Sequence, residues 1–479
     1  MLKKLTFALA IISIVSCSKK FDEMNINKKQ PKEVPAETLF ASAAKNLNRQ
    51  VATLNVNRNV TKLWSQYLTE TTYVDESNYD LISRNIPEQE FTTMYRDVLQ
   101  DLNQAKINTE EETYVLNDDI IAKSNRLAII EILTVYSYER LTTIFGNVPY
   151  SEALASDNNL PKYDDANTIY LDISDRLTAA INSLNVAGGS FASGYDNMFE
   201  GDVATWKKFA YGLQMKMGIM LADQNPAKAQ SLISDAWNNV FSSASEGAYF
   251  PFLSASPNTN PIYEDLVLSG RSDFVAANTI VDMMNSLNDP RIGFYFTYAP
   301  NTTTYVGGDY GASNSYGLCS HAGDVMHTAE MPNVLMDYSE IEFYKAEAIE
   351  RGIGTGNAET HYNNAITASI EYWGGTAQDA TNYLATTNVA YTTAPGNYKQ
   401  KIGTQAWLAY YNRGVMGWTT YRRLDYPVMN LAANAGGELT PKRYTYPINE
   451  QTLNGANYGM ASSAIGGDLK STKLWWDLN

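Results

Sequence analysis

Residues 338–365 read YSEIEFYKAEAIERGIGTGNAETHYNNA. In the first half, apolar side chains recur at helical spacing and stop at a glycine-rich run, which predicts a helix over Tyr338–Arg351 followed by a turn. In the second half, Ala358-x3-Tyr362-x2-Ala365 matches the second helix of a tetratricopeptide repeat. The stretch therefore predicts a pair of helices of the kind that stacks into helical-repeat scaffolds.

The same pattern occurs earlier in the chain. The segment Ala204–Asp223 begins with Trp206-x2-Phe209-Ala210-x2-Leu213, which matches the opening of a tetratricopeptide helix. Residues 128–145 predict another helix, ended by Gly146 and Pro149, and residues 166–184 predict its partner. Asp164 or Asp165 is placed to cap that partner helix. Because a helix pair buries its apolar face only by stacking on another, we predict a predominantly all-α fold, a tetratricopeptide-like helical-repeat scaffold with little β structure.

Four segments rich in loop-forming residues interrupt the predicted helices. They are residues 186–202, 243–270, 297–332 and 376–404. Long loops on a rigid scaffold are where binding sites usually lie. With 479 residues, the chain exceeds the range in which one hydrophobic core keeps growing, so we expect either two lobes or one extended helical scaffold with insertions.

The composition limits the partners of the protein. The formal net charge is −16, whereas nucleic-acid binding needs clustered Lys and Arg, so we expect no nucleic-acid partner. The same acidity argues against docking on anionic lipid through a basic face. Tyrosine is abundant, with 33 residues, and its apolar ring and polar tip suit half-exposed positions and polar ligands as well as ordinary helix packing.

The amino terminus reads MLKKLTFALAIISIVSC over residues 1–17. Lys3 and Lys4 precede an apolar run that is too short to span a bilayer comfortably and is typical of a signal peptide. Ile14-Val15-Ser16-Cys17 resembles a bacterial lipobox, in which cleavage leaves a lipid-carrying cysteine. An ordinary secretory signal with a chance cysteine is the alternative.

These features divide the chain into three parts. We predict a lipoprotein signal peptide over 1–16, a lipidated amino terminus and tether over 17–36, and a helical domain over 37–479. The lipid attachment site is Cys17. Because each buried CH₂ of a lipid chain contributes about 0.8 kcal/mol, a multiply acylated cysteine would anchor the protein stably.

Few side chains in the sequence point to catalysis or metal binding. Cys319, His321 and His327 lie in one loop with the spacing C-x-H-x5-H, but no fourth metal ligand is evident. The G-x-G-x-G run at 352–356 follows a helix and lacks a subsequent Lys-Ser/Thr, which favours a turn over a phosphate site. We predict no catalytic residues, no metal and no cofactor. A glycosidase with paired carboxylates is the enzymatic alternative, although nothing marks out such a pair.

A series of motifs resembles the SusD/RagB family of outer-membrane lipoproteins. The post-tether stretch FDEMNIN is at 21–27, and FGNVPYSEA at 145–153 is similar to the family's FGDVPY turn. The further motifs are the helix that begins near Trp206, DPR at 289–291, EFYKAEA at 342–348, YRRLDYP at 421–427, PKR at 441–443 and WWD at 475–477. Their order and spacing carry the resemblance over nearly the whole chain.

The resemblance implies four tetratricopeptide-like units, a loop-rich lobe and a role as the lid of a SusC-like TonB-dependent transporter. It implies a surface-exposed lipoprotein of the outer membrane that captures glycans for that transporter and is not an enzyme. Because some relatives bind peptides, a peptide ligand is the alternative. A purely structural scaffold and a glycan hydrolase are the other two classes of function. In the FGNVPY turn, Gly146 would take a positive φ and Pro149 would fix the exit. Asp425 and Arg443 either form an ion pair or are both solvated.

Two loop stretches carry the aromatic and hydrogen-bonding side chains that sugar recognition needs. The first is residues 73–79 with Arg84, and the second is the loop after Arg291, with tyrosines between residues 295 and 316. In relatives, the region that corresponds to the first stretch often contributes to the glycan site. From the two stretches we predict ligand contacts by Tyr73, Asp75, Asn78, Tyr79, Arg84, Tyr295, Tyr305 and Tyr316. The alternative is that the tyrosines pack the loops onto the scaffold. The acidic residues favour neutral or basic ligands over sulfated glycans.

Overall fold

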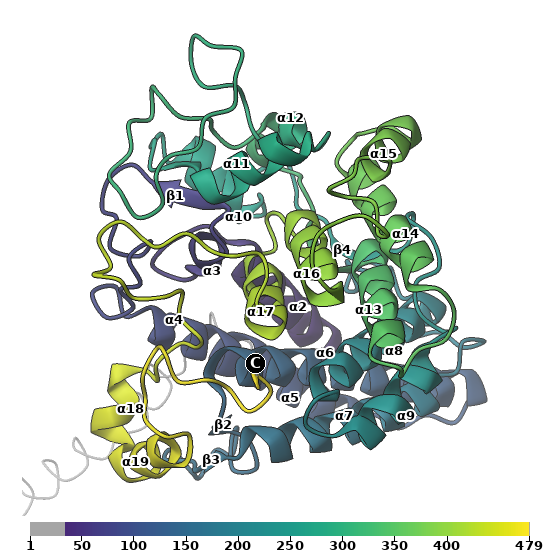
Figure 1. The fold of residues 1–479 in the computed structure, drawn as a ribbon. Helices are drawn as coiled ribbons and strands as arrows, with labels where there is room; N and C mark the ends of the chain where they lie inside the picture. The colour runs from purple at the N-terminus through teal and green to yellow at the C-terminus, as the bar shows by residue number, and fades with distance from the viewer. Residues whose placement is uncertain (1–33, 479) are drawn as a thin grey trace, which may run out of the picture.

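The computed structural model describes residues 34–478, which fold into a predominantly helical protein (Figure 1). This architecture confirms the prediction of an α-helical fold with little β structure. The predicted signal peptide, Cys17 and nearly all of the predicted tether lie outside the described residues. Among the helices that are described, none is long and apolar enough to cross a membrane.

Four pairs of packed helices form the scaffold. They are α6 (Asn117–Phe145) with α7 (Ala166–Ser183), α8 (Val203–Leu221) with α9 (Pro226–Ala236), α13 (Tyr338–Glu350) with α14 (Ala358–Tyr372), and α16 (Tyr398–Ala409) with α17 (Gly414–Leu424). The helices predicted from periodicity are all present. Helix α6 begins earlier than predicted, because Asp118 and Asp119 in its first turn suit the positive end of the helix dipole while adding no apolar periodicity.

Single residues set the ends of these helices. Gly146 has a φ of +85° and ends α6, as the FGNVPY turn predicted. Of the two proposed caps of α7, Asp165 is the one used, and its side chain accepts a hydrogen bond of 2.8 Å from the N–H of Thr168. Asp337 caps α13 in the same way. Side-chain acceptors thus satisfy backbone N–H groups that the first turn of a helix leaves free.

The remaining helices fill the rest of the molecule. They are α2 (Ala36–Ala52), α3 (Thr61–Trp64), α4 (Ile86–Thr92), the π-helix η1 (Thr93–Leu99), α5 (Gln100–Glu111), α10 (Pro261–Tyr263), the π-helix η2 (Glu264–Leu268), α11 (Asn278–Leu287), α12 (Ile292–Tyr295), the 3-10 helix η3 (Asp324–His327), α15 (Ala377–Leu384), α18 (Ile448–Leu453) and α19 (Gly455–Ala464). Helix α15 lies inside a segment predicted as loop-rich. It forms because Thr376 and Asp379 make a capping box at its start.

Three small antiparallel sheets connect distant parts of the chain. β1 (Leu68–Glu70) pairs with β5 (Phe274–Ala276), β2 (Val148–Pro149) with β3 (Tyr163–Asp164), and β4 (Gly247–Phe250) with β6 (Asn333–Asp337). In the first sheet Glu70 is opposite Phe274, and Ala277, just after β5, bridges to Gly308. This sheet therefore holds together the two stretches predicted to bind ligand, far from the stacked pairs α8–α9 and α13–α14 (Figure 1).

Buried ion pairs link the helical units to one another. Lys216 Nζ of α8 lies 2.7 Å from the Glu139 carboxylate of α6, and both side chains are almost fully buried. Arg413, the residue that precedes α17, forms a buried ion pair with Glu340 of α13. Such pairs offset the cost of burying each charge and fix the register of the helices that carry them.

The predicted alternatives for Arg443 are both wrong. Its side chain is fully buried and pairs with Asp468 at 2.5 Å, not with Asp425. Asp425 instead ends α17 with a left-handed φ of +60°. Asp468 lies in the carboxy-terminal segment, so the chain end is tied to Arg443 by an acid that the sequence motif did not include.

Candidate functional site

The two loop stretches predicted to bind ligand are hydrogen-bonded to each other. The Asn78 side-chain N–H₂ donates to the carbonyl of Gly311 at 2.8 Å, and the Ser313 hydroxyl donates to the carbonyl of Thr71 at 2.7 Å. The Gly311 N–H donates to the Thr69 hydroxyl at 3.2 Å. Gly311 has a φ of +76°, and a Cβ there would meet Asn78 and Ala432 at under 3.0 Å, so glycine allows this close approach.

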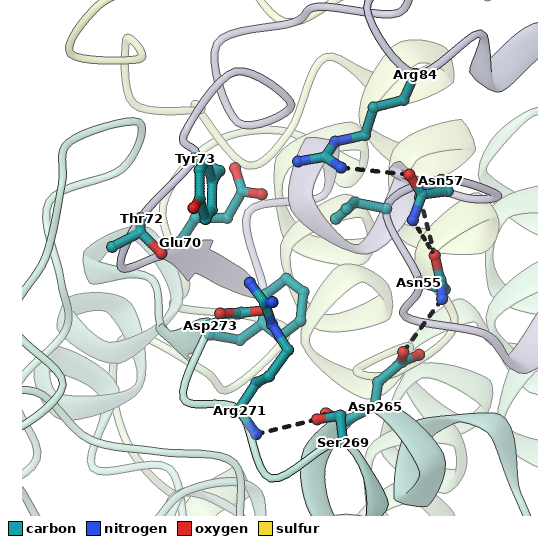
Figure 2. A pocket seen from close by; sticks show the side chains of 12 residues that line it. Asn55, Asn57, Glu70, Thr72, Tyr73, Arg84, Asp265, Ser269, Arg271 and Asp273 are labelled. Carbon is teal, nitrogen blue, oxygen red and sulfur yellow. Dashed lines mark hydrogen bonds and ion pairs between the residues drawn. The ribbon is translucent and has the colours of Figure 1, made fainter.

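A cavity of about 280 Å³ opens beside the first of these stretches. Three segments line it: residues 55–57 after α2, the end of β1 with the loop that follows, and residues 265–274 from η2 to β5 (Figure 2). The walls carry carboxyl, amide and guanidinium groups together with the rings of Tyr73 and Phe274. A few polar groups and one or two rings around a hollow is the usual composition of a site for a small polar ligand.

Tyr73 is the exposed aromatic residue of this cavity. Its side chain is 65% exposed, and its backbone has a φ of +57°. A left-handed conformation is rare for a bulky residue and costs on the order of 1–3 kcal/mol, which the surrounding structure must offset. An exposed ring held by a strained backbone offers a ready platform for the C–H face of a sugar.

Glu70 lies at the buried side of the cavity, where it is 2% exposed. One carboxylate oxygen accepts hydrogen bonds from the Ser77 N–H at 3.0 Å and the Ser77 hydroxyl at 2.8 Å. Burial raises the pKa of Glu70 to about 8, the Ser77 hydrogen bonds oppose this rise, and the neighbouring Glu76 carboxyl adds to it. Burial thus favours the protonated form of Glu70 at neutral pH.

Asp265 is the second carboxyl of the cavity with a raised pKa. Burial raises the pKa of Asp265 to about 6, the adjacent Glu264 adds to the rise, and Lys62 opposes it. The Asn55 side chain donates a long hydrogen bond of 3.4 Å to its Oδ1 (Figure 2). The ionised form of Asp265 therefore receives little stabilisation from neighbouring side chains.

Both arginines of the cavity are engaged by other carboxylates. Arg84 pairs with the buried Glu76 and also donates to Asn57 at 3.3 Å. Arg271 pairs with Asp273 on the same loop. Among the described residues, neither guanidinium forms an ion pair with Glu70 or Asp265.

The structure separates the predicted contacts of the first stretch into three kinds. Tyr73 and Arg84 line the cavity, and Asp75 is exposed on the loop between them. Asn78 is a structural bridge to the second stretch. Tyr79 is fully buried, with its ring edge-on to Trp64 and its hydroxyl near Thr440, which corrects the expectation that it faces a ligand. Its backbone has a left-handed φ of +72°, and its ring belongs to the hydrophobic core.

The second stretch forms a separate aromatic surface that does not line the cavity. Tyr305 is half-buried against the exposed Tyr298 with ring centroids 4.6 Å apart, and Tyr316 stacks on His321 at 3.6 Å. Tyr295 is fully buried in α12, where it stacks on Tyr411, so the prediction that it contacts ligand is also corrected. Its hydroxyl donates to the carbonyl of Leu408, which explains how a tyrosine is accommodated there.

Several residues of the cavity were not identified from the sequence. These are Asn55, Asn57, Glu70, Asp265, Arg271 and Asp273. They come from segments about 200 positions apart, and no local pattern marks such an assembly. The one available signal was the Asn-rich run at 55–57, which is typical of a loop.

The loop with Cys319, His321 and His327 has no metal-site geometry. His321 Nε2 lies 2.7 Å from the carbonyl of Tyr316, and His327 Nδ1 lies 3.0 Å from the carbonyl of Gly323. Across residues 34–478, no three His, Cys, Asp or Glu side chains gather in a way that suits a metal ion. Cys319 is buried, and burial raises the pKa of its thiol.

Comparison with known proteins decides the family. The family described as "SusD-like, Starch-binding associating with outer membrane" matches residues 28–447 of the chain. The chain belongs to the SusD-like family. This SusD-like protein is accordingly a non-catalytic binding protein that associates with the outer membrane, which confirms the prediction that it is not an enzyme.

Solved structures share the fold of this SusD-like protein. One described as a chitin-binding protein is 24% identical, with a TM-score of 0.81 over 93% of this chain and 100% of its own. A chitin-binding SusD homologue from Flavobacterium johnsoniae is 23% identical, with a TM-score of 0.78 over 93% and 99%. A SusD homologue from Parabacteroides distasonis is 22% identical, with a TM-score of 0.80 over 93% and 98%. None of the curated proteins compared matches the chain.

Proposed function

We propose that this SusD-like protein is anchored by lipid at Cys17, faces outward from the outer membrane, captures glycans, and delivers them to a SusC-like TonB-dependent transporter. The observation that carries the proposal is the family match over residues 28–447 to starch-binding, outer-membrane-associated proteins. Two structurally similar proteins described as chitin-binding support a saccharide as the ligand.

The cavity with Tyr73 is the proposed place of capture. It combines an exposed ring, two amide side chains, Asn55 and Asn57, and carboxyl groups, which together offer a stacking face and both hydrogen-bond donors and acceptors. The tyrosine surface around Tyr298 and Tyr305 lies on the stretch that is hydrogen-bonded to this region. A longer glycan would contact the second surface after its first units fill the cavity.

A binding screen against polysaccharides and basic or neutral peptides tests capture. We expect at least one polysaccharide to be retained by the purified protein, and Tyr73→Ala to weaken that binding. Tyr195→Ala is the matched control, because Tyr195 is also an exposed tyrosine but lies in the loop 186–202, away from the cavity. Retention of peptides alone would replace the glycan in this proposal, and retention of neither would overturn it.

Delivery to a transporter has its own test. Purification from the native membrane in mild detergent should recover a large β-barrel protein together with this chain. Absence of such a partner under several detergents, with the neighbouring genes intact, would contradict this part of the proposal and leave capture untouched.

A further inference from the structure

Two carboxyl groups of the cavity, the buried Glu70 and the half-buried Asp265, lack a cationic partner among the described residues. The side chains of Glu70 and Asp265 both line the cavity, and neither forms an ion pair with any side chain of residues 34–478. The other two carboxyls nearby, Glu76 and Asp273, are paired with Arg84 and Arg271. The cavity therefore keeps an excess of acid after all its internal pairs are formed.

The groups around Glu70 leave it short of positive charge. Ser77 contributes two neutral hydrogen bonds to one oxygen, and the neighbouring Glu76 carboxyl adds to the rise in the pKa of Glu70. Glu76 is 1% exposed, one of its oxygens pairs with Arg84, and its other oxygen has no hydrogen-bond donor among the described residues. A carboxyl beside another carboxyl favours its protonated form, because ionising it would bring two like charges close together.

The groups around Asp265 also give its carboxylate little stabilisation by positive charge. Glu264 next to it is already paired with Arg49 at 2.8 Å. Lys62 opposes the rise in the pKa of Asp265, but its Nζ donates to the carbonyl of Ala52 at 2.7 Å, and burial lowers the pKa of Lys62 to about 7. A partly neutral amine committed to a helix end gives Asp265 little compensation.

We infer that the cavity selects saccharides that carry a free ammonium group, such as glucosamine units, over the same saccharides in neutral N-acetylated form. The ammonium donates to Glu70 or Asp265, and Tyr73 at the mouth takes the apolar face of the sugar. This inference rests on the proposed capture function and names its substrate class. A positive group supplies what the cavity lacks, since charge-assisted hydrogen bonds are roughly twice as strong as neutral ones.

The source of the selectivity is the replacement of a proton by the ligand. In the free protein burial favours the protonated form of Glu70 at neutral pH, and an incoming ammonium favours its ionised form. Binding should therefore release protons to the solvent. A neutral sugar hydroxyl would bind without this release, which gives a readout independent of affinity.

The test compares two ligands of equal length on the purified full chain. A glucosamine tetrasaccharide and its fully N-acetylated form are titrated by calorimetry at about pH 6.5, where amines are largely protonated, in two buffers of different ionisation enthalpy. We expect the glucosamine form to bind about tenfold tighter, as a charge-assisted hydrogen bond predicts, and to release protons. Glu70→Gln and Asp265→Asn should each reduce the preference, and Glu371→Gln, an exposed acid on α14, should not.

The outcomes separate this inference from the proposed function. Equal binding of both tetrasaccharides, or a preference that survives both Glu70→Gln and Asp265→Asn, would overturn the inference while capture stands. Binding of neutral glycans with no binding of the glucosamine form would do the same. If no saccharide in the full screen binds, both the inference and the proposed function fail. Thermal unfolding of each variant verifies that the chain remains folded, and the Asp265→Asn variant serves if Glu70→Gln does not fold.

Discussion

The side-chain amide of Asn78 joins two loops that are more than 200 residues apart, because it donates to the carbonyl of Gly311 at 2.8 Å. The same side chain also donates to Val74 and accepts from the backbone N–H of Asn434. A single half-buried asparagine thus connects the cavity loop, the tyrosine loop and the carboxy-terminal region. Its three hydrogen bonds make the site one body instead of three independent loops.

Removal of this amide should therefore loosen the site. Asn78→Ala leaves the carbonyl of Gly311 and the N–H of Asn434 without this partner, and we expect the free energy of unfolding to fall by about 1–3 kcal/mol. Urea unfolding measures the loss. Asn382→Ala is the control, since Asn382 is exposed on α15 and should change stability by less than about 0.5 kcal/mol. Equal effects of the two substitutions would show that the bridge contributes nothing.

Substitution of Tyr73 should weaken ligand binding without lowering the stability of the fold. Because its φ is +57° and its ring is largely exposed, Tyr73→Gly removes a strained backbone and few contacts. We expect the stability to stay constant or rise by up to about 1 kcal/mol, while ligand affinity falls by about 1–3 kcal/mol, as for lost stacking on nucleic-acid bases. Calorimetry and thermal unfolding on the same sample measure both. Unchanged affinity in a folded Tyr73→Gly variant would move the site to the surface of Tyr298 and Tyr305, where Tyr305→Ala is the corresponding test.

The sequence predicted the scaffold better than the site, and particular residues show why. The pair α13–α14 was predicted correctly because its apolar side chains recur every three or four positions, and such a pattern is local. Tyr79 and Tyr295 were predicted as ligand contacts because tyrosine suits both a core and a surface. The residue type alone does not report which of the two applies, and both rings are buried.

The cavity could not be predicted for a different reason. Glu70 and Asp265 are brought to one hollow by the three-residue strand β1 and its pairing with β5, and strands this short have no periodicity to detect. The pKa values of these two carboxyl groups also depend on burial and on the absence of a cationic partner in the described part of the chain, which are properties of the fold. Tyr73 and Arg84 were identified because loop residues of suitable type next to a helix are visible in the sequence.

The buried ion pair between α6 and α8 should be sensitive to loss of one partner. Lys216→Met leaves Glu139 as a buried charge without its cation, and we expect the free energy of unfolding to fall by about 3–5 kcal/mol. The double variant Lys216→Met, Glu139→Gln removes both charges and should recover a large part of this loss. Chemical denaturation of the two variants measures the difference. A double variant as unstable as the single one would show that packing, and not charge, dominates at this position.

Cys17 determines how the protein is held at the membrane. Cys17→Ala should move the protein from the membrane fraction to the soluble fraction and abolish incorporation of labelled lipid. Cys319→Ala is the matched control, because Cys319 is the other cysteine of the sequence and is buried in the fold. If the Cys17→Ala variant still carries labelled lipid, the anchor lies elsewhere.

The raised pKa of Glu70 should give the protein a defined pH dependence. In the unfolded chain a glutamic acid titrates near 4.3, whereas burial raises the pKa of Glu70 to about 8 in the folded protein. Between these values the folded state binds more protons than the unfolded state, so this group makes stability decrease as the pH rises. Glu70→Gln removes that contribution. As the pH rises from about 5 to about 8, the unfolding free energy of the unsubstituted protein should therefore fall relative to that of Glu70→Gln.

The measurement is urea unfolding of both proteins at several pH values in that window. Asp75→Asn provides the control, because Asp75 is exposed on the same loop and its substitution should leave the pH slope unchanged. A glucosamine ligand at saturating concentration should reverse the trend in the original protein, since the bound ammonium favours the ionised carboxyl that high pH produces. Parallel stability curves for Glu70→Gln and the unsubstituted protein would mean that Glu70 ionises as readily in the folded protein as in water. The cavity would then have no reason to prefer a cationic ligand at Glu70.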